Sequence, residues 1–162
     1  MKKIITLILI FALTSSLLIS CGKGSYKDDV SIDTISQKIE SLVSVDGGYK
    51  TLSDDYLQFY FKLPAGVTES VVVQSVKSED ITEFGIFKAD KKNIDDLEDA
   101  IEDYIDEQED VLVPQVNMYA PEEAPKIENA SVRVFGNYVV YLVMEKDDQR
   151  VVYDAIEALL KK

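Results

Sequence analysis

The sequence predicts an α+β fold, with a small antiparallel sheet that includes a C-terminal β-hairpin at about residues 130–145 and helices packed on one face. The hairpin is indicated by alternating β-type residues on either side of Gly136 and Asn137, a pair that suits a two-residue turn. Two more β-rich segments lie at residues 71–76 and 81–89. Apolar stripes with helical spacing lie before, between and after these segments, and this order is typical of α+β domains.

Residues 1–20 have the layout of a secretory signal peptide. Lys2 and Lys3 precede an uncharged apolar core at residues 4–13, and small residues follow it. The apolar run ends at Ile19, so it is shorter than the roughly 20 residues that a membrane-spanning helix needs. We therefore exclude this leader from the fold.

The end of the leader, Leu-Ile-Ser-Cys-Gly at residues 18–22, resembles the bacterial lipobox. In that signal the cysteine thiol receives a diacylglyceryl group and a peptidase cuts before it, which implies cleavage between Ser20 and Cys21 and a lipid on Cys21. Two acyl chains meet the requirement for stable anchoring. We expect a lipid-anchored protein at the outer face of the plasma membrane. The alternatives are a secreted protein with a free thiol and an uncleaved apolar anchor.

The chain after the leader is long enough for one domain and too short for two. Residues 21–29 are predicted to be a lipidated tether, because Gly22, Gly24 and Ser25 make this stretch small and polar. Such a tether spans only about 15 Å on average. Residues 30–162 are then the folded domain.

A first helix is expected after Ser31, a suitable N-cap, and should end before Gly47 and Gly48. Residues 52–63 fit both a strand and a helix, and the cap at Ser53 favours a short helix. The longest helix is expected at residues 93–112. After it, the prolines should break the chain into a loop, with one helical turn starting at the second of them; they are Pro114, Pro121 and Pro125.

The hairpin turn fixes which residues pair across its two strands. One face pairs Val134 with Val139, Val132 with Tyr141 and Ala130 with Val143, and is apolar enough to be buried. The other face is either an exposed surface for a partner protein or the floor beneath a helix; its candidate contact residues are Arg133, Phe135, Tyr138 and Val140. A final helix is expected after Asp147 or Asp148.

The charge and composition exclude several functions. The chain has net charge −13, and removing Lys2 and Lys3 makes it more acidic, so we expect no nucleic-acid partner. The chain has no histidine and its one cysteine is the predicted lipid site, which removes the usual nucleophilic triads and zinc ligand sets. We therefore expect no enzyme, no cofactor and no metal. A pair of carboxylates is the remaining enzymatic route.

The acids of the long helix suit Ca²⁺ in kind but not in arrangement. Residues 90–101 fail the EF-hand pattern because Lys92 and Ile94 occupy ligand positions and Asp96 stands where glycine is needed. We expect diffuse screening by cations rather than a specific site.

Four segments in this order resemble a family of clostridial lipoproteins: residues 83–89 (Glu-Phe-Gly-Ile-Phe-Lys-Ala), an acidic helix, residues 119–121 (Tyr-Ala-Pro) and residues 136–139 (Gly-Asn-Tyr-Val). The family is known only as domain of unknown function number four-three-five-eight. The resemblance covers roughly residues 30–160. It implies a Gram-positive, surface-anchored lipoprotein and brings no catalytic or binding residues with it.

The leading functional hypothesis is a membrane-anchored cell-envelope lipoprotein that binds another envelope protein and is not an enzyme. The first alternative is a lipoprotein that binds a small ligand or a cation. The second is a carboxylate-dependent hydrolase, which would need two buried acids facing one cleft.

Overall fold

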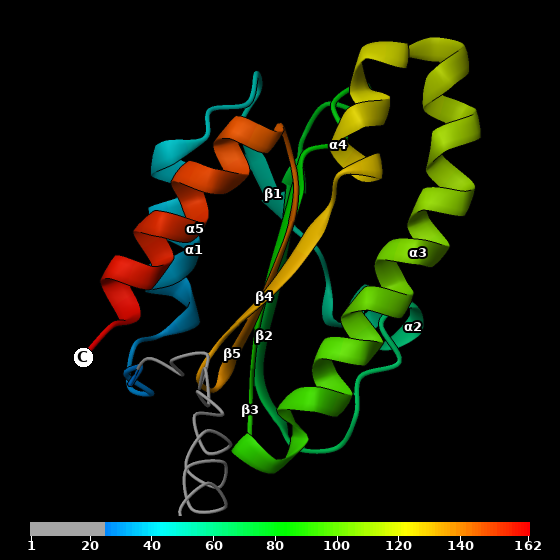
Figure 1. The fold of residues 1–162 in the computed structure, drawn as a ribbon. Coiled ribbons are helices and arrows are strands. Elements are labelled where there is room, and N and C mark those ends of the chain that lie inside the picture. The colour runs from blue at the N-terminus through cyan, green and yellow to red at the C-terminus, as the bar shows by residue number, and fades with distance from the viewer. Residues whose placement is uncertain (1–24) are drawn as a thin grey trace, which may run out of the picture.

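The computed structural model describes residues 25–162 and shows one five-stranded antiparallel sheet in the order β1-β2-β3-β5-β4 (Figure 1). The strands are β1 (Tyr49–Thr51), β2 (Val67–Ser75), β3 (Glu83–Ala89), β4 (Ser131–Phe135) and β5 (Tyr138–Val143). The helices are α1 (Ile32–Leu42), α2 (Asp54–Tyr60), α3 (Ile94–Tyr119), α4 (Ala124–Glu128) and α5 (Lys146–Leu160). Short 3₁₀ turns, η2 (Lys91–Asn93) and η3 (Pro121–Glu123), precede α3 and α4. The predicted leader, its cleavage site at Ser20 and the lipid site at Cys21 lie outside the described residues.

The α+β class is confirmed, but the helices cover both faces of the sheet rather than one. α1 and α5 pack on one face through a hydrophobic cluster that includes Ile39 and Ile156. α2, α3 and α4 pack on the other face through a second cluster that includes Leu97 and Ile127. Figure 1 shows the sheet between these two helical layers. The reason lies in the central strands: every residue of β5 is buried, so both of its faces need a cover.

The predicted hairpin register is confirmed, with Val134 opposite Val139 and Phe135 opposite Tyr138. The second hairpin face is the floor beneath α1 and α5. Phe135, Tyr138 and Val140 are 3%, 0% and 0% exposed, so the predicted exposed partner surface is wrong for these three residues. Arg133 alone is exposed, and its guanidinium carbon lies 4.2 Å from the centroid of the Tyr153 ring.

The capping residues explain where the first two helices begin. Ser31 caps α1 by accepting a hydrogen bond from the Thr34 N–H. Ser53 does the same for α2 with the Tyr56 N–H, so the favoured helical interpretation of residues 52–63 is confirmed. α1 ends at Leu42, with Val43 as its C-cap, before Gly47 and Gly48 as the sequence predicts.

α3 continues through Pro114 to Tyr119, so the loop predicted at Pro114 is wrong. An interior proline removes one helical hydrogen bond and costs about 3 kcal/mol. Beyond this proline Val116 is buried, and the Ala120 N–H donates to its carbonyl at 2.7 Å. Packing of this last part of the helix offsets the local penalty. The helical turn predicted at Pro121 is present as η3.

The first described residues belong to the folded domain rather than to a tether. The Lys27 N–H donates to the Leu160 carbonyl at 2.7 Å, and the Lys162 N–H donates to the Ser25 carbonyl at 2.9 Å. Tyr26 pairs with Lys161 in an isolated antiparallel bridge. The predicted boundary at residue 30 is therefore wrong, because the domain already includes residues 25–27. No helix within residues 25–162 has the length and hydropathy needed to cross a membrane.

Candidate functional site

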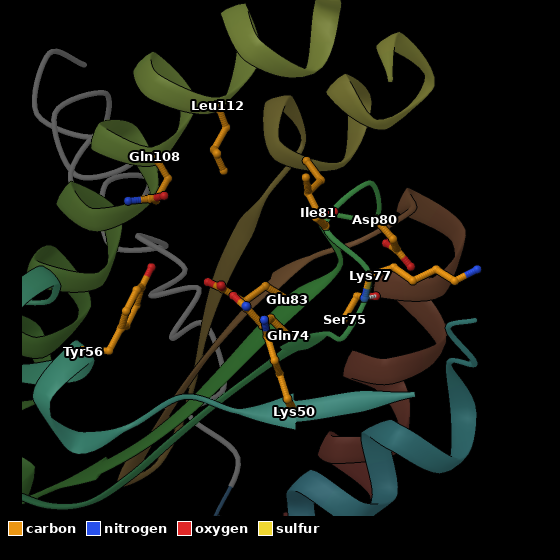
Figure 2. A pocket seen from close by; sticks show the side chains of 11 residues that line it. Lys50, Tyr56, Gln74, Ser75, Lys77, Asp80, Ile81, Glu83, Gln108 and Leu112 are labelled. Carbon is orange, nitrogen blue, oxygen red and sulfur yellow. Dashed lines mark hydrogen bonds between the residues drawn. The ribbon is translucent and has the colours of Figure 1, made fainter. Parts of the chain in front are cut away.

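A cavity of about 180 Å³ opens between the sheet and α3. Its lining includes Lys50 of β1, Tyr56 of α2, Glu83 at the start of β3, and Gln108 and Leu112 of α3. Figure 2 shows these side chains converging on one space from the sheet and the two helices. Glu83 is the acidic group in this lining that no cation neutralises, since no lysine or arginine within residues 25–162 forms an ion pair with it.

The alternation of side chains along β3 places Glu83 on the α3 side of the sheet. Glu83, Gly85 and Phe87 share one face, and Phe87 belongs to the cluster under α3. Gly85 lies opposite Tyr141 of β5. A Cβ at Gly85 would lie only 2.1 Å from the Tyr141 Cε1, so the glycine makes room for the tyrosine ring. That room lets the Tyr141 hydroxyl reach Glu83.

Two tyrosine hydroxyls bind the same oxygen of Glu83. Tyr141 donates to Glu83 Oε1 at 2.6 Å and Tyr104 of α3 donates to it at 2.9 Å. The hydroxyl of Tyr56 lies 3.4 Å from that of Tyr104 and extends the network towards the cavity. The Tyr104 ring is held by stacking on Phe61, with centroids 3.8 Å apart. Within residues 25–162 no hydrogen bond is made to Glu83 Oε2.

The surroundings shift the proton equilibria of this network in one direction. Burial raises the pKa of Glu83 above its ordinary value, while the hydrogen bonds from Tyr141 and Tyr104 act to lower it. Burial also raises the pKa of Tyr104, Tyr141 and Tyr56. The tyrosines therefore stay protonated and act as donors, and the carboxyl of Glu83 is the group that gains or loses a proton.

A smaller apolar pocket of about 20 Å³ continues from the cavity. The two share Ile81, Glu83, Gln108 and Leu112, and the smaller one is closed by Ile105, Ile127 and Val143. Glu83 thus lies at the junction of a polar space and an apolar one.

A buried ion cluster fixes the rim of the cavity. The Lys126 Nζ of α4 binds Asp80 Oδ1 at 2.9 Å and Glu123 Oε2 at 2.8 Å, and it also donates to the Thr82 hydroxyl at 3.1 Å. Burial acts to lower the pKa of Lys126, but the hydrogen bonds to Glu123 and Asp80 raise it overall. The lysine therefore stays charged and ties the loop between β2 and β3 to α4.

The same cluster binds Asp80, the second acidic residue of the cavity. Asp80 lines the cavity, but its Oδ1 accepts hydrogen bonds from the Thr82 N–H and from Lys126. Burial acts to raise the pKa of Asp80, and the bonds from Thr82 and Lys126 outweigh it, so the pKa is lowered. Asp80 is thus a carboxylate paired with a lysine, whereas Glu83 has no cationic partner within residues 25–162. Within residues 25–162, no group of three or more acidic, histidine or cysteine side chains could hold a metal ion.

The residues predicted to form a partner surface are not part of this cavity. Phe135, Tyr138 and Val140 belong to the cluster under α1 and α5, on the opposite face of the sheet from Glu83. The sequence did not identify Glu83, because a single acidic residue at the start of a strand has the same pattern as a solvent-exposed residue at a strand end. The available signal was Tyr141, whose hydroxyl sits on the hairpin face predicted to be buried and therefore needs a polar partner.

The fold and the site define a small α+β domain in which a five-stranded antiparallel sheet, covered on both faces, supports a polar cavity on its α3 side. The chain belongs to the family described as Domain of unknown function (DUF4358), whose model matches residues 43–145. The matched segment contains the whole sheet and every residue that lines the cavity, while α1 and α5 lie outside it. No curated protein and no solved structure shows a significant match.

Proposed function

We propose that this chain is a lipid-anchored, extracytoplasmic lipoprotein whose domain binds a small ligand in the cavity beside Glu83, without transforming it chemically. The observation that carries the binding activity is a partly buried carboxylate with one oxygen left without a partner within residues 25–162, at the wall of an open cavity. The anchoring rests on the resemblance of residues 18–22 to a lipobox.

Ligand binding is favoured over the protein-binding hypothesis because the hairpin face that suggested a partner is buried beneath α1 and α5. A hydrolase with a pair of acids is disfavoured, since the second carboxylate at the cavity, Asp80, is committed to Lys126 and Thr82. The sequence also lacks histidine, the residue most often used for proton transfer near neutral pH.

The binding activity is tested with the full chain in detergent, by thermal unfolding against a library of small sugars, amines, amino acids and carboxylates. A ligand present at 100 times its Kd stabilises a protein by about 2.7 kcal/mol, which gives a clear rise in Tm. Leu112→Trp should fill the cavity and abolish the rise. Val111→Trp, on the exposed side of the same helix, is the matched control and should retain it. Loss of the rise in both variants, or in neither, would contradict this assignment of the site.

The anchor is tested separately in cells. Labelling with a radioactive fatty acid should mark the wild-type chain and not Cys21→Ala, because the thiol of Cys21 is the predicted acceptor of the lipid. An unlabelled wild-type chain would refute the anchor and leave the ligand site untouched.

A second candidate function is protein binding at α2, where Phe59 is 75% exposed and its ring lies 4.9 Å from that of Tyr60. Crosslinking in intact cells decides it. One dominant neighbour that is lost in Phe59→Ser, and retained in the Arg133→Ser control, would support this function over ligand binding alone.

A further inference from the structure

We propose that the ligand is a small zwitterionic amino carboxylate, whose ammonium group binds Glu83 and whose carboxylate is met by Lys50. This inference rests on the proposed ligand-binding function and specifies the class of compound. Glu83 and Lys50 line the same cavity with opposite charges, and within residues 25–162 neither of them forms an ion pair. A ligand that bridges them must carry both charges itself.

The ammonium end follows from the free oxygen of Glu83. Both tyrosine donors bind Oε1, so Oε2 is the acceptor left for a ligand. Oε2 belongs to a partly buried carboxylate at the wall of the cavity, where an ammonium group would replace water and supply both the positive charge and hydrogen-bond donors. An anionic ligand would be repelled at this point, and an alcohol would leave the charge uncompensated.

The carboxylate end follows from Lys50. It lies on β1 opposite Gln74 of β2, and both residues line the cavity. The other lysine in the lining, Lys77, is already paired with Asp46. Lys50 is exposed, so its attraction for a ligand is screened by solvent and should contribute less than that of Glu83.

The size of the cavity sets the size of the compound. At about 180 Å³ it is smaller than the roughly 300–1,000 Å³ of pockets that hold drug-sized molecules, so the ligand is a small metabolite rather than a peptide. The adjoining apolar pocket of about 20 Å³ accepts a short alkyl group beside the ammonium. A small amino acid meets all three conditions.

The pH dependence of binding follows from the groups that face Glu83. These are Tyr104 from α3, Tyr141 from β5, Tyr56 from α2 and Lys50 from β1. The three tyrosines have raised pKa values and stay neutral, so Glu83 is the group that changes charge. An ammonium group binds the ionised form of Glu83. The affinity should therefore fall as the pH drops through the pKa of Glu83, and more protons should be released on binding.

The test is isothermal titration of the full chain in detergent with alanine, 4-aminobutyrate, butylammonium, butyrate and butanol. At least one amino carboxylate should bind tenfold or more tightly than butylammonium, butyrate and butanol. Glu83→Gln keeps the shape and the acceptor for the tyrosines, and it should weaken binding at least tenfold. Lys50→Gln should weaken binding about threefold. Glu79→Gln and Lys38→Gln, exposed residues of the same types outside the lining, should leave the affinity unchanged.

Equal binding by a single-charge analogue, or full affinity in Glu83→Gln, would overturn the zwitterion assignment. If only neutral or anionic compounds bind, and Leu112→Trp blocks them, the ligand-binding function stands and this inference fails. If no compound of any class in the wider library binds, both fail.

Discussion

The two faces of the sheet use tyrosine hydroxyls in different ways. Under α1 and α5, the Tyr138 hydroxyl donates to the Val30 carbonyl at 2.6 Å and that of Tyr153 to the Ser131 carbonyl at 2.7 Å. Under α3, the hydroxyls of Tyr104 and Tyr141 donate to the carboxylate of Glu83. Main-chain acceptors are fixed in charge, whereas a carboxylate changes charge with pH. These two hydroxyls on the first face therefore donate to groups that do not titrate, whereas the second face holds a chemically responsive group beside a cavity.

The family match follows the same division. It covers the sheet and the α3 layer and leaves α1 and α5 outside. The predictions that follow separate stability on one face from binding on the other.

The largest effect is expected for Ile39→Ala on the face under α1, where Ile39 is completely buried. Removing its side chain should lower the free energy of unfolding by about 2–5 kcal/mol, because packing is lost and a cavity remains. Urea denaturation measures this loss, with Lys38→Ala on the exposed side of α1 as the control. Ligand affinity of the folded fraction should not change; a change would show that the two faces are coupled.

Gly85→Ala should have a smaller effect on stability and a specific effect on the site. The added methyl group would overlap the Tyr141 ring, and such overpacking costs about 1–3 kcal/mol. Displacing the ring also removes a donor from Glu83, so its pKa should rise further. Denaturation and carboxyl NMR titration measure the two effects. A variant with normal stability and an unchanged Glu83 pKa would show that the glycine does not position Tyr141.

Glu83→Gln should change how stability depends on pH. Because the pKa of Glu83 is raised in the folded protein, its stabilising contribution is complete below the ordinary value of 4.5 and is lost as pH rises through the folded value. Each unit of that difference is worth about 1.4 kcal/mol. Wild type should therefore lose stability relative to the variant as pH rises, in denaturation series at several pH values. Glu79→Gln should show no such trend; a parallel trend would assign the effect to general charge repulsion.

Arg133→Ala should have the smallest effect, about 0.5–1 kcal/mol, from loss of its contact with the Tyr153 ring. The midpoint of thermal unfolding is sensitive enough to detect it. Ligand affinity should be unaffected, since Arg133 lies on β4 outside the cavity lining. Weakened binding would contradict the division between the two faces.

Features fixed by neighbouring residues could be predicted from the sequence. The turn at Gly136 set the hairpin register, and the cap at Ser53 favoured α2. Features that depend on distant packing could not. α3 passes through Pro114 because contacts beyond it outweigh local propensity. The second hairpin face is covered by α1 as well as α5. The residues of β4 and β5 do not indicate that a helix from the beginning of the domain packs on them.

The candidate site shows the same limit. Glu83 is joined to Tyr104 and Tyr141, which lie 21 and 58 positions further along the chain. The sheet order, with β5 next to β3, brings Tyr141 to Glu83, and the packing of α3 on this face of the sheet brings Tyr104. Periodicity identified Tyr141 as buried, but it could not name the acid that its hydroxyl meets.

The docking of residues 25–27 onto the end of α5 has a consequence for how an anchored molecule would stand on its membrane. If Cys21 carries lipid, the chain can reach at most about 14 Å from it to Ser25. Tyr26 packs beside Gly136, and the Asn137 carbonyl accepts from Ala89 at the far end of β3 from Glu83. The rise of β3 puts about 20 Å between those ends. The hairpin turn would then lie nearest the membrane, and Glu83 with its cavity would lie at the end of β3 that is farther from the lipid headgroups.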